Sequence, residues 1–183
     1  MEQKSDKDLV KLSLSDKEAF LPLMRRYEER LFRYILRISS FSQEEAEDTL
    51  QEVFIAIYRN LYNFDERLSF SSWAYRIAHN KTISRYRFKK ARPQTVNIEN
   101  TDVNKLISHI NLEEEVNNKI LSKKVLSILN HLKTSHKEII VLKYLEEKSY
   151  QEISDILKKP IGSVATNLKK AKESFKSNWL KNN

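Results

Sequence analysis

The sequence contains no cysteine, one glycine and three prolines among its 183 residues. Without cysteine, the chain has no disulfide, no thiol nucleophile and no cysteine-ligated zinc site. With Gly162 as its one glycine, it cannot form the glycine-rich loops that bind nucleotide phosphates, because these loops need several glycines at fixed spacing. Because glycine and proline interrupt regular structure most strongly, their scarcity predicts a chain that is nearly all helix.

Long apolar runs are also missing from the sequence. No segment has the roughly 20 consecutive apolar residues of a membrane-spanning helix. No apolar core of a signal peptide follows Met1. We therefore expect a cytoplasmic protein with no direct membrane insertion.

Positive charge is abundant. Lysine and arginine number 33 against 25 acidic residues, which gives a net charge of +8. Such an excess indicates an acidic polymer or a membrane surface as the partner. The hydrophobic fraction of 40% is slightly low and the charged fraction of 32% is high, so two small domains fit the composition better than one thick core.

Residues 67–98 contain no acidic residue, and cations alternate there with aromatic residues. These residues are Trp73, Tyr75, Arg76, Lys81, Arg85, Tyr86, Arg87, Phe88, Lys89, Lys90 and Arg92. Cations hold phosphates and aromatic faces stack on unpaired bases, which is what a single-stranded nucleic-acid site requires. The alternative is an amphipathic helix whose basic face is solvated, with Trp73 and the other aromatic residues packed into a core.

An acidic helix precedes this basic stretch. Ser42 and Glu45 have the spacing of a capping box, which predicts a helix over residues 42–61. Its acidic residues are Glu44, Glu45, Glu47, Asp48 and Glu52. Those in the first turn suit the helix dipole, but acid on one helix and base on the next indicate two surfaces with different partners.

The pattern of the second half predicts a separate helical domain. Residues 93–112 include Pro93 and show little periodicity, which indicates a flexible linker between domains at 1–92 and 113–183. Ser149 with Glu152 forms a second capping box, and a short helix, a tight turn at 158–161 and a helix over 162–176 follow. This order is typical of a helix-turn-helix, although an ordinary helical hairpin with a solvated lysine face has the same pattern.

Polar residues on the second helix of this motif suit DNA. They are Ser163, Thr166, Asn167, Lys169 and Lys170. Residues of these types bind phosphates and base edges in a major groove. Val164, Leu168 and Ala171 lie on the other side and predict the face that packs inward.

Two stretches of the first half, AEDTLQEVF at 46–54 and FSSWAYRIAHN at 70–80, resemble region 2 of the extracytoplasmic-function (group IV) RNA polymerase sigma factors. The stretch from Ser149 to Lys172 resembles region 4 of the same family. The chain departs from the family pattern at Ala74, where leucine is usual, and at Ala165 and Asn167, where basic residues are common. The departures on the second helix suggest a different sequence preference at the −35 element.

The resemblance implies an all-α protein of two small helical domains joined by a flexible linker. It implies a subunit that binds core RNA polymerase and directs promoter recognition, DNA melting and transcription initiation, and that is not an enzyme. It implies three sets of site residues: core polymerase binding by Asp48, Gln51, Glu52 and Ile55; −10 DNA binding by Phe64, Trp73, Asn80, Lys81, Arg85, Arg87 and Lys89; and −35 DNA binding by Ser163, Thr166, Asn167, Lys169 and Lys170. It also implies an anti-sigma factor as a partner, and no catalytic residue, metal or cofactor.

Three other interpretations of the residues remain open. One is a helix-turn-helix regulator that acts without polymerase, and another is an RNA-binding protein built on the basic helix. The third is a metal-dependent nuclease or phosphohydrolase that uses Glu44, Glu45, Asp48 and His79. Carboxylates on one helical turn rarely face a single metal, which weighs against this third interpretation.

Overall fold

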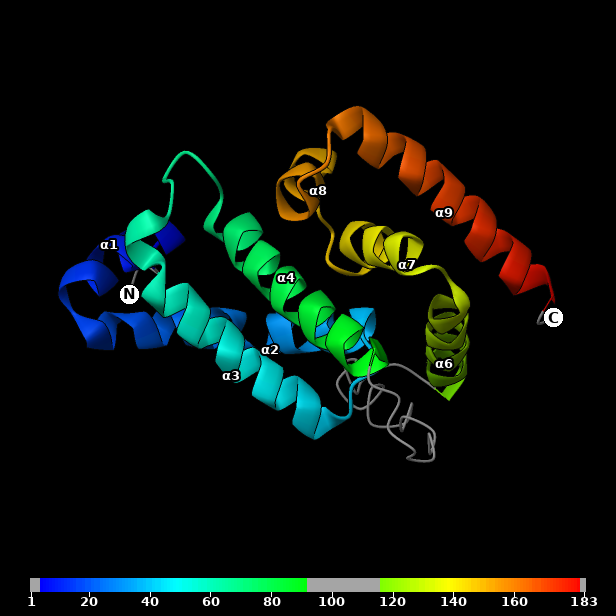
Figure 1. Ribbon diagram of the computed structural model, residues 1–183, viewed down its shortest axis with the longest axis horizontal. Coiled ribbons are helices and arrows are strands. Elements are labelled where there is room, and N and C mark those ends of the chain that lie inside the picture. Colours follow the sequence, from blue (N-terminus) through cyan, green and yellow to red (C-terminus); the bar gives the residue numbers. More distant parts are fainter. Residues whose placement is uncertain (1–3, 92–115, 182–183) are drawn as a thin grey trace.

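The computed structural model describes residues 4–91 and 116–181, with side chains from 121 onward in the second range, and all regular structure there is helical (Figure 1). This confirms the predicted fold class. The predicted linker at 93–112 lies outside the described residues. The elements in order are α1 (Asp6–Ser15), η1 (Lys17–Ala19), α2 (Phe20–Ile38), α3 (Gln43–Arg59), η2 (Leu61–Asn63), α4 (Phe70–Ala91), α6 (Val116–His131), α7 (Thr134–Ile140), the π-helical turn η3 (Val141–Leu145), α8 (Tyr150–Leu157) and α9 (Ile161–Lys181).

Side-chain caps explain where several helices begin. The Ser42 hydroxyl accepts a hydrogen bond from the Glu45 amide, and the Glu45 carboxylate accepts one from the Ser42 amide. Ser149 and Glu152 repeat this arrangement at the start of α8, so both predicted capping boxes are confirmed. At α7 Lys133 occupies the N-cap position, and its side chain makes no capping bond.

The first helical bundle is α1 to α4. Its buried apolar side chains include Leu31 and Ile35 of α2 and Val53 and Ile57 of α3. Helix α4 buries Ala74, Ala78 and their neighbours, so the side of the helix that carries these small residues faces the core. Burial of this apolar surface is the main favourable contribution to the stability of the bundle.

The second bundle is α6 to α9, and it contains the predicted helix-turn-helix. Helix α8 ends at Lys158, whose φ of 51° and ψ of 47° are left-handed, and the chain turns through Pro160 into α9. Val164, Leu168 and Ala171 of α9 are buried, as their spacing predicts. Helix α9 therefore packs one face against α7 and α8 and leaves the other exposed.

The two bundles lie against each other. Helix α8 packs beside α4, while α7 and η3 contact α2, and one set of buried apolar residues runs through both bundles (Figure 1). Among the helices that the structure describes, none has the length and apolar character needed to cross a membrane.

Candidate functional site

Helix α3 presents an acidic face to solvent. Asp48, Gln51, Glu52 and Ile55 are all exposed on it. The side chains of Asp48 and Glu52 are 57% and 52% exposed. The four residues expected to bind the polymerase thus share one accessible face. Two of them are charged, Gln51 is polar and Ile55 is apolar.

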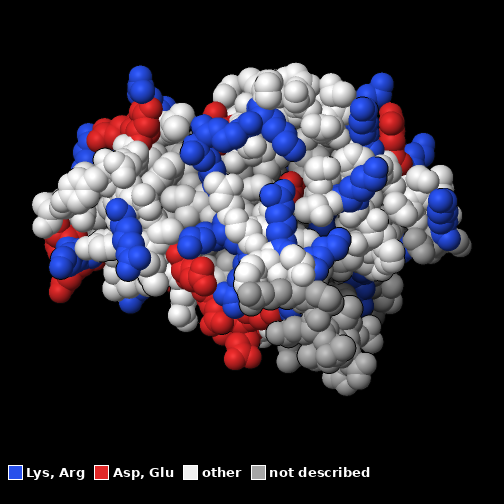
Figure 2. All heavy atoms as spheres, in the orientation of Figure 1, with Lys and Arg blue, Asp and Glu red and all other residues white. Residues whose placement is uncertain are grey.

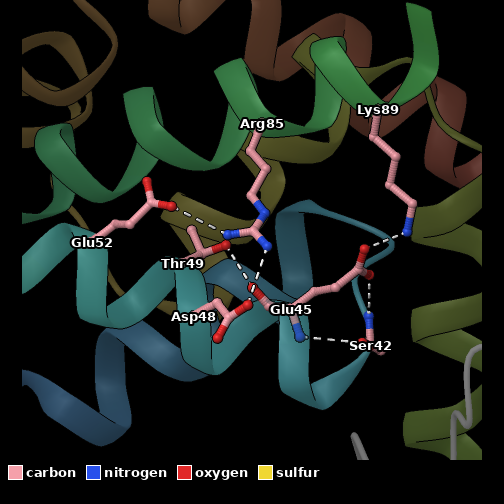
Figure 3. A network of polar contacts seen from close by, with 7 residues as sticks. All are labelled: Ser42, Glu45, Asp48, Thr49, Glu52, Arg85 and Lys89. Atoms are coloured by element: carbon pink, nitrogen blue, oxygen red, sulfur yellow. Dashed lines mark hydrogen bonds and ion pairs between the residues drawn. The ribbon is translucent and has the colours of Figure 1, made fainter. Parts of the chain in front are cut away.

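Basic residues of α4 form ion pairs with this acidic face. Arg85 extends from α4 between Asp48 and Glu52, with nitrogen–oxygen distances of 3.4 Å to each (Figure 3). Lys81 lies 3.5 Å from Glu52. The sequence indicated two separate surfaces; in the structure the two meet along the α3–α4 pair.

Glu45 joins the helix cap to this network. One of its carboxylate oxygens accepts from the Ser42 amide and the other from Lys89, at 2.5 Å (Figure 3). Burial raises the pKa of Glu45, but the hydrogen bonds from Lys89 and Ser42 outweigh it and lower the pKa below its usual value. Glu45 is therefore an anion that fixes the start of α3 and attracts the end of α4.

The charge distribution over the molecule is uneven. Figure 2 shows the largest group of acidic side chains over the beginning of α3, while lysine and arginine side chains spread over the second bundle and the upper part of the same face. A cationic surface beside an acidic one suits a protein that contacts nucleic acid with one and a basic partner with the other.

An aromatic cluster supports the loop between η2 and α4. The rings of Phe64, Phe70 and Trp73 contact one another, with centroid distances of 5.2 to 5.7 Å. Phe64 is only 8% exposed and Trp73 is partly buried, so neither ring stands free at the surface. Beyond them in the loop, hydrogen bonds from Arg67 lower the pKa of Asp65 to about 2.

The remaining residues expected to bind the −10 strand lie further along α4. Asn80, Lys81, Arg87 and Lys89 are exposed, and Arg85 is half-buried. Asn80 therefore lies on the surface of the same helix whose beginning contributes Phe70 and Trp73 to the aromatic cluster.

The exposed face of α9 carries the residues expected to bind the −35 element. Ser163, Thr166, Lys169 and Lys170 are exposed, and Asn167 is half-buried. The Thr166 hydroxyl donates to the carbonyl of Gly162 at 2.9 Å. The face thus offers cations and small polar groups along one side of a helix, the form that enters a major groove.

The residues of the hydrolase interpretation are not brought together. Nε2 of His79 lies 3.4 Å from Glu138 of the second bundle, while Glu45 and Asp48 pair with cations of α4. In the two described ranges, no three histidine or carboxylate side chains are grouped so that they could hold a metal ion.

Sequence reasoning missed the contacts between the two bundles. Arg37 and Tyr75 both bind Glu146, and Lys148 binds Ser71. The partners of these pairs are 71 to 109 residues apart, so no local spacing could have indicated them.

Both bundles match known families. Residues 23–92 match the model of Sigma-70 region 2, and residues 122–175 match that of Sigma-70, region 4. The chain is 32% identical to the ECF RNA polymerase sigma factor SigW of Bacillus subtilis (strain 168), over 96% of this chain and 97% of the relative. It is 30% identical to the ECF RNA polymerase sigma-E factor of Haemophilus influenzae, over 96% of each.

Solved structures share the fold. CnrH, solved in complex with the cytosolic domain of CnrY, matches with a TM-score of 0.70 at 22% identity, over 95% of this chain and 96% of that one. The sigma factor RpoE of Bartonella quintana, solved with the anti-sigma factor NepR, matches with a TM-score of 0.67 at 17% identity, over 87% and 95%.

Two helical bundles with the sequence patterns of regions 2 and 4 define a sigma-70-type transcription initiation protein. With relatives at this level of identity along nearly its whole length, the chain belongs to the ECF RNA polymerase sigma factors. It directs RNA polymerase in promoter recognition and transcription initiation, and it is not an enzyme.

Proposed function

We propose that three surfaces of this chain carry out separate steps of transcription initiation. The exposed face of α3 binds core RNA polymerase, the α4 helix with its preceding loop binds and helps to melt the −10 element, and α9 reads the −35 element. The corresponding domains are 1–92 and 113–183, joined by a linker at 93–112. The observation that carries the proposal is that each predicted set of residues lies together on one element, with most of its members exposed.

The polymerase surface is the acidic face of α3. Asp48 and Glu52 offer carboxylates to a basic partner, and Ile55 adds apolar area beside them. The cations of α4 that lie against these carboxylates do so at 3.4 to 3.5 Å and in solvent, where ion pairs contribute little. A basic polymerase surface can therefore replace them at small cost.

The −10 surface combines the exposed cations of α4 with the loop above it. Lys81, Arg85, Arg87 and Lys89 hold phosphates, and Asn80 contacts a base that has left the stack. Because Phe64 and Trp73 are packed against each other, they hold the loop between η2 and α4 in place. The extracted base binds beside these two rings. Removing a base from the duplex costs a few kcal/mol, which stacking and hydrogen bonds offset.

The −35 surface is the exposed face of α9. Lys169 and Lys170 hold phosphates, while Ser163, Thr166 and Asn167 face base edges. Asn167 suits adenine, whose N6 and N7 form a bidentate pair with an amide. We expect selection for adenine at one position of the −35 element.

Run-off transcription tests the proposal. Purified protein is added to bacterial core polymerase with a promoter library that varies the −35 and −10 elements, beside the variant Asp48→Arg/Glu52→Arg. A matched control, Glu18→Arg/Glu28→Arg, changes the same net charge at exposed positions of η1 and α2. We expect initiation with the native chain and the control, and none with the α3 variant.

Two outcomes would contradict the assignment. Equal loss of initiation in both variants would mean that net charge, and not the α3 face, sets polymerase binding. Sequence-specific duplex binding without any binding to core polymerase would instead indicate a helix-turn-helix regulator that acts alone.

We also propose an anti-sigma factor as a partner and the cytoplasm as the location. Two similar folds were solved with such partners, the cytosolic domain of CnrY and the anti-sigma factor NepR. Polymerase and promoter DNA lie in the bacterial cytoplasm, where this chain must meet them. Purification of a tagged chain from its own cells, with identification of a stoichiometric bound protein that blocks core binding in vitro, tests the partner.

A further inference from the structure

One aromatic ring is unusually accessible on the first bundle. Tyr62 of η2 is 79% exposed, more than any other large apolar or aromatic side chain that the structure describes. Its hydroxyl donates to the carbonyl of Leu14, near the end of α1, at 3.1 Å. This bond ties the ring to a neighbouring helix, so its orientation is fixed although most of its surface faces water.

A ring held in this way suits a binding surface. Tyrosine has few side-chain torsions to order, so it offers a large contact area at a small entropic cost. Tyrosines are also frequent among the residues that dominate the affinity of protein interfaces. A single exposed apolar residue needs no explanation, however, so the neighbours of Tyr62 decide whether it belongs to a surface.

Tyr62 continues an apolar side of α3. Ile55 and Tyr58 precede it by seven and four residues, the spacing of one helical side, and they are 51% and 37% exposed. The Tyr58 ring packs on Phe20 at the start of α2, with 5.2 Å between ring centroids. Because Leu14 and Phe20 flank the short η1, both tyrosines lie over the corner where α1 passes into α2 (Figure 1). We call Ile55, Tyr58 and Tyr62 the apolar extension.

The apolar extension joins the face of α3 that we propose binds polymerase. At about 1.5 Å per residue, the part of that face from Asp48 to Ile55 is only about 10 Å long. A stable interface takes about 800 Å² from each partner, contributed by about 20–30 residues. Four residues are too few to supply that area, whereas continuing the contact to Tyr62 roughly doubles its length.

The charges around Tyr62 favour a protein partner over nucleic acid. Lys11 of α1 lies 3.3 Å from Glu66, and Arg67 lies 2.8 Å from Asp65, so these two cations are paired with carboxylates of the loop after η2. A phosphate backbone that crossed the ring would meet both carboxylates. An apolar protein surface gains free energy by covering the exposed rings.

We infer that the apolar extension, with Tyr62 as its anchor, is a further part of the polymerase contact. The matching polymerase element is amphipathic, with cations opposite Asp48 and Glu52 and apolar side chains opposite Tyr62. This inference rests on the proposed function of the α3 face. Because the two ends of the contact differ, the element fits along α3 in one direction: reversal would bury the two carboxylates against apolar side chains without a partner.

Equilibrium binding of the full chain to labelled core polymerase, without DNA, tests the inference. Tyr62→Ser removes the ring, whereas Tyr62→Phe keeps it and removes the hydroxyl that binds Leu14. The matched control is Tyr144→Ser, at a tyrosine of η3 in the other bundle that is 51% exposed. Asp48→Arg/Glu52→Arg, measured beside them, tests the α3 face itself.

We expect Tyr62→Ser to weaken core affinity at least about tenfold, as truncation of an anchoring tyrosine does. Tyr62→Phe should stay within about threefold of the native chain because the ring remains, and Tyr144→Ser should leave the affinity unchanged. Since Tyr62 is exposed, its variants should match the native chain in circular dichroism, urea unfolding and binding to −35 duplex.

A second measurement locates the ring without removing it. Because the chain has no cysteine, Asn63→Cys places a single photo-crosslinker at an exposed position beside Tyr62. Glu47→Cys places one at an exposed position beside Asp48. In the complex of polymerase, chain and promoter, both positions should label the same polymerase subunit.

Three results would overturn the inference: native core affinity in Tyr62→Ser, an equal loss in Tyr144→Ser, or labelling of promoter DNA and not polymerase from position 63. The last would assign Tyr62 to the −10 surface instead. If Asp48→Arg/Glu52→Arg retains core binding, the proposed role of α3 fails whatever Tyr62 does. If that variant alone loses core binding, the α3 face stands and the apolar extension fails.

Discussion

The turn of the helix-turn-helix places a lysine where glycine is the better residue. Lys158 has a φ of 51°, and its amide caps α8 by donating to the carbonyl of Ser154. An L-residue in this conformation costs about 1–2 kcal/mol, which glycine avoids. We expect Lys158→Gly to raise the free energy of unfolding by about 1 kcal/mol, after the entropy that glycine adds to the unfolded chain.

Urea unfolding followed by circular dichroism measures this change. Lys159→Gly is the matched control, because the backbone at 159 does not have a positive φ. There glycine should lower the free energy of unfolding by about 0.5–1 kcal/mol. Destabilisation of similar size in both variants would mean that Lys158 is not strained in solution.

Lys137 makes the free energy of unfolding depend on pH. Burial lowers the pKa of Lys137 to about 8, from 10.5 when it is exposed to water. Between these values Lys137 carries more protons in the unfolded chain than in the folded one, so its contribution to stability rises with pH from about 8 to about 10.5. The rise is on the order of 3 kcal/mol if Lys137 alone determines it.

Burial raises the pKa of Tyr27, Tyr34 and Tyr75, so these hydroxyls stay protonated in the folded chain but ionise near pH 10 in the unfolded chain. They therefore oppose the effect of Lys137 above about pH 9.5, and the rise is read between about pH 8 and 9.5. We expect Lys137→Met to remove most of the rise, as measured by urea unfolding at steps of pH. Burial also lowers the pKa of Lys148, which leaves a smaller rise in the same direction. An identical pH profile in native chain and variant would mean that Lys137 is hydrated.

Among the elements, what could be predicted depends on how far apart the interacting residues lie in the chain. The caps at Ser42 and Ser149 were predictable because each involves a residue three positions away. The buried face of α9 followed from helical periodicity. The pairing of Arg37 with Glu146 was not predictable, because both are ordinary charged residues until the packing of two bundles removes water from both.

The contact between α3 and α4 was not predictable either, because its partners are also far apart in the sequence. Acidic residues on one helix and basic residues on the next predicted two surfaces. Most of these acidic and basic side chains are exposed, which supports the prediction of both surfaces. What the pattern could not indicate is that Arg85 lies between Asp48 and Glu52, since this depends on the angle at which α4 crosses α3. Likewise Phe64 was expected to contact DNA, and its burial in the aromatic cluster follows from contacts with α4.

At this scale the α3–α4 ion pairs should matter more for binding than for stability. Their side chains are 32% to 57% exposed, and ion pairs in contact with solvent contribute at most about 1 kcal/mol. We expect Arg85→Ala to change the free energy of unfolding by less than about 1 kcal/mol and to leave core polymerase binding intact or stronger, because it removes a competing cation. Asp48→Asn/Glu52→Gln should change stability as little but abolish core binding.

Titration of labelled core polymerase with each variant, beside urea unfolding, measures both effects. Equal loss of core affinity in the two variants would contradict this division, since it would make Arg85 part of the polymerase contact itself.

Across the whole molecule, salt should separate the two kinds of charge interaction. The ion pair between Arg37 and Glu146, which joins the two bundles, is shielded from solvent, whereas Lys169 and Lys170 of α9 are exposed. Exposed charges are screened over about 10 Å at 0.1 M salt and about 3 Å at 1 M, while buried pairs are screened much less. Raising sodium chloride from about 0.1 to 0.5 M should therefore change the free energy of unfolding little while weakening binding to −35 duplex steeply.

Lys169→Ala should reduce the slope of log affinity against log salt concentration by about 1, since each neutralised phosphate releases close to one counterion. Lys17→Ala, at an exposed position of η1 in the other bundle, removes the same charge and should leave the slope unchanged. Fluorescence anisotropy of labelled duplex and urea unfolding of the free chain can be followed across the same salt series. If the free energy of unfolding fell in parallel with DNA binding, the two bundles would be held together by surface charge and not by the buried pair of Arg37 with Glu146.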